Sequence, residues 1–236
     1  MEIQPINCAI ELRDFIPLDG SPLKAVIFDL DGTLIDTMPA FADIATDVIT
    51  RYTTIPAEIA RASYLNTSGL PFRSQVELIV PGSGDLDVMS TEYEQRKLMI
   101  PGKIEMSDDT VFTLSNLRRH GLGTAISSNN QQANVSKFSE AAPVSFDVAL
   151  GYRFGFGKGQ EHIAQVCRHY NCGPRSLLYV GDSLNDAILA RNCGVPFVAL
   201  TRTFTEARFR TLDDRIPCIS ELSHLLNLLQ INHINV

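Results

Sequence analysis

The stretch KAVIFDLDGTLIDT, which spans residues 24–37, decides the fold of this chain. Its first half, residues 24–30, is a short run of β-branched and aromatic side chains, which is typical of a buried strand. The sequence Asp-Gly-Thr follows at once, and this combination favours a turn. We therefore expect a buried strand that places Asp29 and Asp31 at its carboxyl end.

The segment after this strand is expected to be helical. Six apolar residues from about Pro39 onward recur at steps of three and four, which indicates one apolar helical face: Phe41, Ile44, Ala45, Val48, Ile49 and Tyr52. Three further helices are expected at about residues 56–65, 71–80 and 91–100. Thr91 and Glu94 have the spacing of a capping box at the start of the last helix. Residues 38–100 are therefore predicted to form a small all-helical domain inserted after the first strand.

After residue 102 the pattern alternates between strands and helices. The expected strands cover residues 122–127, 146–150, 176–180, 196–200 and 217–219. The expected helices cover residues 108–120, 131–139, 160–170, 185–192 and 222–229. Repeated strand–helix units predict an α/β fold with a parallel sheet and helices on both faces. Residues 23–37 and 101–236 are expected to form this core, and residues 1–22 an N-terminal extension.

The composition argues against several classes of protein. Of the 236 residues, 44% are hydrophobic and 20% are charged, and the apolar runs are far shorter than the roughly 20 residues that span a bilayer. A formal net charge of −7 argues against a protein that grips a nucleic-acid backbone. The five cysteines are scattered without a C-x-x-C pair, unlike a disulfide framework or a zinc site. We expect a cytoplasmic protein, without a secretory signal, that binds neither nucleic acid nor membrane.

Four carboxylates lie at or near the ends of two predicted strands. Asp29 and Asp31 follow the first strand, and Asp182 and Asp186 lie in GDSLND after the strand at 176–180. Ligands of parallel α/β sheets bind outside the carboxyl ends of the strands, so these side chains are expected to lie together. Clustered carboxylates repel one another. A hard cation with oxygen ligands, such as Mg²⁺, would compensate for this repulsion.

A hydroxyl group and an ammonium group complete the predicted site. Ser127, Ser128 and Asn129 end the strand at 122–127, and Lys158 lies in the glycine-rich loop GFGKG. An aspartate can attack phosphorus to form an aspartyl-phosphate, while a second carboxyl group serves as general acid and base. A metal ion, an ammonium group, a hydroxyl group and backbone N–H groups would stabilise the transferring phosphoryl oxygens. The residues therefore favour phosphoryl transfer.

These motifs resemble those of a known family. DLDGTLIDT, the strand-terminal serine of AISSN, Lys158 and GDSLND resemble, in order, the four motifs of the haloacid dehalogenase superfamily. The helical block resembles the inserted cap of its phosphoglycolate phosphatase and β-phosphoglucomutase-like branch. The resemblance covers roughly residues 23–200 and implies a Rossmann-like α/β core with a helical cap.

The resemblance implies a Mg²⁺-dependent phosphatase that acts on a small phosphorylated metabolite of the phosphoglycolate or sugar phosphate class. A phosphosugar mutase is the alternative, because mutases keep the second aspartate, and release of free phosphate distinguishes the two. A catalytically silent binding or regulatory relative is a third possibility, but it would have lost a core residue. The chain is expected to act as a monomer or a homodimer.

The resemblance also implies roles for the acidic motifs and the lysine. Asp29 would be the nucleophile and a metal ligand, and Asp31 the general acid and base, with its backbone carbonyl on the metal. Asp182 would bind the metal directly, and Asp186 through water or through Lys158. Lys158 would also hold the phosphate group.

Further residues would support the phosphate and the leaving group. Ser127 is expected to hold the phosphate through its side chain, and Ser128 and Asn129 through their backbone. Thr33 would orient the Asp31 region, and both Gly32 and Thr33 are expected to help bind the phosphate. In the helical block, the stretch at residues 66–75 is expected to reach toward the substrate when the block closes over the strand ends. Within it, Arg73 is the predicted specificity contact.

Overall fold

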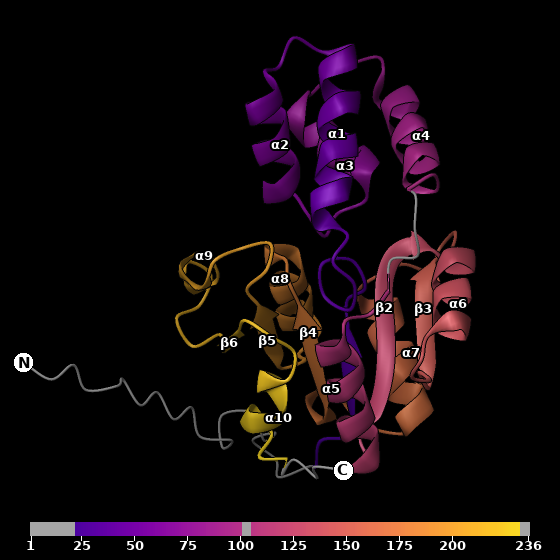
Figure 1. Ribbon diagram of the computed structural model, residues 1–236, viewed down its shortest axis with the longest axis vertical. Coiled ribbons are helices and arrows are strands. Elements are labelled where there is room, and N and C mark those ends of the chain that lie inside the picture. Colours follow the sequence, from indigo (N-terminus) through magenta and orange to yellow (C-terminus); the bar gives the residue numbers. More distant parts are fainter. Residues whose placement is uncertain (1–21, 101–104, 232–236) are drawn as a thin grey trace, which may run out of the picture.

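The core of the protein is a six-stranded parallel sheet. The computed structural model describes residues 22–100 and 105–231 (Figure 1), so the predicted extension lies, apart from its last residue, outside the described part of the chain. Every neighbouring pair of strands is parallel, and their order is β3-β2-β1-β4-β5-β6. The strands are β1 (Ala25–Phe28), β2 (Gly123–Gln131), β3 (Val148–Tyr152), β4 (Leu177–Gly181), β5 (Phe197–Leu200) and β6 (Cys218–Ile219). The predicted parallel α/β sheet is confirmed.

Helices cover both faces of this sheet, as the uniformly apolar first strand requires. Val26 and Phe28 of β1 pack in one hydrophobic cluster with residues of α5 (Asp108–Arg119), α6 (Gln132–Ala141) and α10 (His224–Leu228). Ala25 and Ile27 point to the opposite face. There they pack with residues of α7 (Gln160–Tyr170), α8 (Leu184–Asn192) and α9 (Glu206–Arg210).

Four helices lie between β1 and β2 in the sequence. In space they form a block above the carboxyl ends of the strands (Figure 1). They are α1 (Met38–Tyr52), α2 (Ala57–Asn66), α3 (Phe72–Ile79) and α4 (Leu86–Lys97). The block has its own hydrophobic cluster, in which the rings of Phe72 and Tyr93 stack with their centroids 3.8 Å apart. The helices are therefore confirmed. The exact division into domains stays a prediction, because residues 101–104 lie outside the described part of the chain.

Two helices differ from the prediction. α4 begins at Leu86 rather than near Thr91. Thr91 lies inside this helix, where its hydroxyl donates to the carbonyl of Asp87, four residues earlier, instead of capping a helix. The short helix α9 was not predicted, since its five residues are too few to show a periodic pattern. Among residues 22–100 and 105–231, none of the helices combines the length and apolar character needed to cross a bilayer.

Candidate active site

A pocket opens at the carboxyl ends of β1, β2 and β4, where the helical block meets the sheet. Its empty volume, with the open mouth included, is about 590 Å³. The helical block lines it through α1, α4 and the segment between α2 and α3. The core lines it through Asp29, Asp31, Ser128, Asn129, Asn130, Lys158, Asp182 and Ser183. This is the position at which parallel α/β sheets bind their ligands.

Lys158 joins two carboxylates that come from different strands. Its Nζ atom lies 2.7 Å from Oδ1 of Asp29, after β1, and 2.6 Å from Oδ1 of Asp186, at the start of α8. All three side chains are almost completely buried. Asp182, after β4, completes the cluster, because one carboxylate oxygen from each aspartate lies within 4.8 Å of the other two. Three segments that are remote in the sequence thus meet beside Asp29.

Burial and mutual repulsion dominate the electrostatics of this cluster. Burial raises the pKa of Asp29 well above its usual value, while Lys158 lowers it and the charges of Asp186 and Asp182 raise it further. Burial, followed by the charge of Asp186, raises the pKa of Asp182 to about 7. Burial alone would lower the pKa of Lys158, but Asp186 and Asp29 outweigh it and raise that pKa. One ammonium group therefore faces three carboxylates, and negative charge remains in excess.

The three aspartates fit a small divalent cation. Hard cations prefer carboxylate oxygens, and a cation here would supply the positive charge that Lys158 alone does not. Asp29 and Asp182 also line the pocket, whereas Asp186 accepts hydrogen bonds from Lys158 and from the backbone N–H and hydroxyl of Ser183. Asp29 and Asp182 are therefore suited to hold the cation. Asp186 does not line the pocket and positions Lys158 through their ion pair.

The turn after β1, which carries Asp31, also supports Asp182. The Thr33 hydroxyl donates to Oδ1 of Asp182 over 3.2 Å, and the Thr203 hydroxyl donates to Oδ2 of the same carboxylate. Gly32 has a φ of +82°, and a Cβ atom there would overlap the Asp182 carboxylate. The backbone N–H of Gly32 donates to the Ile35 carbonyl, so this residue also closes the turn that carries Asp31. That Gly32 and Thr33 bind the phosphate stays a prediction.

Asp31 is held by two donors. The Thr37 hydroxyl donates to Oδ1 over 2.8 Å, and Nδ2 of Asn130 donates to Oδ2 over 2.6 Å. Both Asp31 and Asn130 line the pocket. Sequence reasoning missed Asn130, whose only signal is its place just beyond the serines that end the predicted strand. Thr37 was part of the first motif, but its partner becomes visible only in the fold.

Ser128, and not Ser127, lines the pocket. The Ser127 side chain is fully buried and its Oγ atom lies 2.9 Å from Nδ1 of His162 on α7. Because side chains alternate along a strand, Ser127 shares the α7 face with Ala125, whereas Ser128 faces the pocket. The prediction that the Ser127 side chain faces the phosphate site is therefore wrong, and the neighbouring Ser128 lines the pocket instead.

His162 makes the stability of the fold depend on pH. It is fully buried, and among the described residues its Nε2 atom has no hydrogen-bond partner. Burial lowers the pKa of His162 to about 4, whereas an unfolded histidine titrates near about 6.5. Between these values the unfolded state binds the additional proton, so the contribution of His162 to the free energy of unfolding falls as the pH falls below about 6.5. At about pH 5 the free energy of unfolding is lower by about 2 kcal/mol through His162 alone than it is well above pH 6.5.

We therefore expect His162→Asn to lose this component of the pH dependence. Urea unfolding at about pH 5 and about pH 7 measures it for the wild type and the variant. His169→Asn is the matched control, because His169 is exposed on the same helix and its replacement should leave the pH dependence unchanged. An identical pH dependence in wild type and His162→Asn would show that His162 is not the group responsible.

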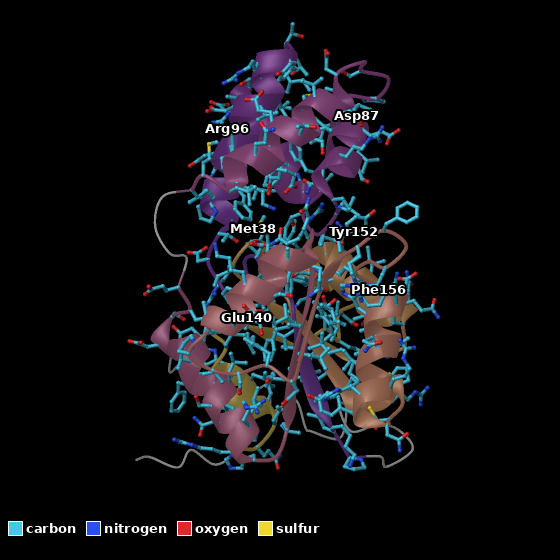
Figure 2. All side chains as sticks on the ribbon, turned by 90° about the vertical axis from the view of Figure 1, so that its right-hand side faces the viewer. Met38, Asp87, Arg96, Glu140, Tyr152 and Phe156 are labelled. Atoms are coloured by element: carbon cyan, nitrogen blue, oxygen red, sulfur yellow. The ribbon has the colours of Figure 1, made fainter. Side chains whose placement is uncertain are left out.

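The helical block touches the pocket through different residues from the predicted one. Arg73 is half-exposed and pairs with Asp87, at 2.6 Å, and with Glu77, at 3.4 Å. Asp87 lies on the upper part of the block, away from the junction with the sheet that Met38 marks (Figure 2). The prediction that Arg73 contacts the substrate is therefore wrong, because Arg73 forms ion pairs at the surface. The cation that the block contributes to the pocket is Lys97 of α4.

The stretch at residues 66–75 does reach the pocket, through Ser68 and Gly69. The Gly69 carbonyl accepts a 2.8 Å hydrogen bond from Nδ2 of Asn129, and the Ser68 carbonyl accepts a 2.5 Å bond from Nδ2 of Asn185. Gly69 has a φ of +86°, and a Cβ atom there would meet the side chains of Ser183 and Asn185. The helical block is thus seated directly on the loops that carry the aspartates.

Comparisons with known proteins agree with these motifs and this fold. A family model described as haloacid dehalogenase-like hydrolase matches residues 26–200. Phosphoglycolate phosphatase 1 of Pseudomonas aeruginosa is 25% identical over 231 residues, which cover 86% of this chain and 82% of that protein. Phosphoglycolate phosphatase of Nitrosospira multiformis is 28% identical over 205 residues, which cover 79% of this chain and 87% of that protein.

A solved structure gives the same picture of the fold. The haloacid dehalogenase-like hydrolase of Bacteroides fragilis superposes with a TM-score of 0.72 at 22% identity, over 87% of this chain and all of that one. At this level of identity the likeness supports the α/β architecture and not a particular substrate.

Proposed function

The chain belongs to the haloacid dehalogenase-like hydrolase family, and from this membership and its site we propose that it is a magnesium-dependent phosphatase. Its substrate is a small phosphorylated metabolite, which it hydrolyses through an aspartyl-phosphate on Asp29. The observation that carries the proposal is the meeting of Asp29, Lys158 and Asp182 in one pocket, with Asp31 two residues away on the same turn.

In the first half-reaction, Asp29 attacks the phosphorus atom of the ester. Lys158 holds Oδ1 of Asp29, so Oδ2 is the free oxygen that forms the new bond to phosphorus. The bond between phosphorus and the ester oxygen breaks, and Asp31 donates a proton to the leaving alkoxide. Thr37 and Asn130 keep the Asp31 carboxyl group in place for this transfer. An aspartyl-phosphate and a free alcohol result.

In the second half-reaction, Asp31 takes a proton from a water molecule that attacks the aspartyl-phosphate. The bond between phosphorus and Asp29 breaks, which releases inorganic phosphate and restores both carboxyl groups. Lys158 and the Ser128 hydroxyl contribute donors to the phosphoryl oxygens in both steps. A magnesium ion bound by Asp29, Asp182 and the Asp31 carbonyl would add positive charge at those oxygens.

The relatives support a choice of substrate class. Two of them carry the name phosphoglycolate phosphatase. We therefore place phosphoglycolate first and sugar phosphates second among the candidates. The relatives' names do not favour the phosphosugar mutase alternative, which would return the phosphoryl group to another hydroxyl of the product.

Magnesium removal and phosphate release test this function together. We expect inorganic phosphate to appear from 2-phosphoglycolate or a sugar phosphate when magnesium is present, and a chelator to abolish its release. Asp182→Asn should raise the magnesium concentration for half-maximal rate by at least about tenfold, because one anionic ligand is lost. Full activity in the chelator would contradict the metal requirement. An isomerised sugar phosphate without free phosphate would favour the mutase.

A further inference from the structure

Lys97 is a cation of the helical block that reaches the core. It is the last residue of α4, and only 13% of its side chain is exposed. Its Nζ atom donates a 2.8 Å hydrogen bond to Oδ1 of Asn130, and both residues line the pocket. The Nδ2 atom of Asn130 in turn donates to Asp31. One amide side chain thus separates the ammonium group from the carboxyl group that serves the leaving oxygen.

Aromatic rings fix the position of this ammonium group. Nζ lies 4.5 Å from the ring centroid of Phe41 and 5.3 Å from that of Tyr93. Contacts of this kind attract a cation to the face of a ring, and they gain strength where water is excluded. Tyr93 and Phe41 are themselves buried in the core of the helical block. Lys97 is therefore held on a rigid support instead of moving freely at the surface.

Of the two lysines in the pocket, Lys97 is the less strongly paired with carboxylates. Among the described residues that line the pocket, two are cationic, Lys97 and Lys158. The Nζ atom of Lys158 forms ion pairs with Oδ1 of Asp29 at 2.7 Å and with Oδ1 of Asp186 at 2.6 Å. Lys97 forms one ion pair, with the half-exposed Glu94, whose Oε2 atom lies 3.7 Å from Nζ. Of the three donors on its ammonium group, one goes to Asn130, so donors remain for a ligand.

A second unused donor lies in the same pocket. The hydroxyl of Ser68 is buried, and among the described residues it has no hydrogen-bond partner. Buried polar groups without a partner are rare, and this one belongs to the segment that the helical block places over the strand ends. Lys158 and Asn130 of the core already donate to aspartates, whereas the Ser68 hydroxyl and part of the Lys97 ammonium group have no partner among the described residues.

We propose that Lys97 binds a second anionic group of the substrate, carried on the part that leaves as the alcohol. This inference rests on the proposed phosphatase function and narrows its substrate class. Because Lys97 reaches the site on the side of Asp31, the anionic group lies on the alcohol side of the breaking bond. The substrate is then a small phosphate monoester whose alcohol carries a carboxylate or a second phosphate.

The alternative role of Lys97 is a latch between the helical block and the core. A latch would act on every substrate alike, since its hydrogen bond to Asn130 does not involve the substrate. An anion-binding residue acts selectively, because a charge-assisted hydrogen bond is lost only for substrates that carry the anion. Matched substrates therefore separate the two roles.

The test compares 2-phosphoglycolate with its uncharged amide, the phosphate ester of glycolamide, and with ethylene glycol bisphosphate. For the wild type we expect kcat/KM for at least one of the two anionic substrates to exceed that for the amide by about 10- to 100-fold. The bisphosphate shows whether a carboxylate or a second phosphate is preferred. Lys97→Met, which keeps a long apolar stem, should bring the anionic substrates to within about threefold of the amide. The loss of the hydrogen bond to Asn130 should lower kcat/KM for the amide far less than for the anionic substrates.

Two further variants complete the experiment. Lys97→Arg keeps the charge and should restore part of the preference. Arg73→Met removes a cation of the helical block that pairs only with surface carboxylates and should behave as wild type. Equal hydrolysis of all three substrates by the wild type, or an equal loss for all three in Lys97→Met, would overturn this inference alone. Absence of phosphate release from every substrate would overturn the phosphatase function and this inference with it.

Discussion

Replacing Asp29 with asparagine is expected to lower kcat by at least about 10⁴-fold, the size of effect seen when a nucleophile is removed. The amide is almost isosteric with the carboxyl group but cannot form the bond to phosphorus. The fold should persist, because Lys158 keeps its 2.6 Å contact with Asp186. Neutralising Asp29 also removes a buried charge, whose cost is visible in the raised pKa of this group. Steady-state phosphate release and urea unfolding measure the two effects separately.

Asp36→Asn provides the matched control for this prediction. Asp36 lies seven residues further along the same motif but is exposed, so its replacement should change kcat by less than about threefold. If Asp29→Asn retained a rate within about tenfold of wild type while remaining folded, water would have to attack the phosphorus directly, and Asp29 would be only a metal ligand.

Replacing Lys158 with methionine is expected to affect both activity and stability. The side chain is 2% exposed and contacts Asp29 and Asp186, so its loss leaves two buried carboxylates without their common partner. Breaking a buried ion pair in this way costs about 3–5 kcal/mol of unfolding free energy. The rate should fall by about 10³-fold, because a donor to the phosphoryl oxygens is lost as well.

The stability effect should depend on pH and is best measured by urea unfolding in the presence of a chelator. The carboxylates take up protons as the pH falls, and protonated groups repel one another less, so the loss of stability should shrink at low pH. Lys137→Met is the control, because Lys137 is exposed. Equal stability of Lys158→Met and Lys137→Met would mean that the buried ion pairs contribute little to the fold.

The fold was predictable because its signals are local. Residues 25–28 are all apolar, which requires helices on both faces of the sheet, and the observed clusters around Val26 and Ile27 show this arrangement. The meeting of Asp29 with Asp182 followed from the same logic. Strands that run in parallel bring their carboxyl ends to one edge, so two aspartates 153 positions apart need only the strand pattern to be placed together.

The orientation of individual side chains was not predictable in the same way. Ser127 and Ser128 are chemically identical neighbours, and only the alternation of β2 assigns one to His162 and the other to the pocket. Arg73 is the predicted specificity contact because it lies in the segment that is expected to reach toward the substrate. Its direction depends on α3, which turns it toward Asp87 on the surface.

Lys97 had no signal in the sequence, since it lies at the end of a helix that carries many charges. Its position depends on how α4 packs against α1, which brings Phe41 under its ammonium group. Chemistry and recognition are thus separated along the chain. We propose that residues close to the sheet perform the reaction and that the helical block supplies donors that distinguish one alcohol from another.

The central claim is that a carboxylate of the chain, and not water, attacks the phosphorus atom of the substrate. The stereochemical course at phosphorus tests it most directly. A phosphorothioate ester that is isotopically chiral at phosphorus is hydrolysed in isotopically labelled water, and the configuration of the released thiophosphate is determined. Two successive displacements, first by Asp29 and then by water, predict retention of configuration. Inversion would show a single displacement by water and would contradict the proposed mechanism.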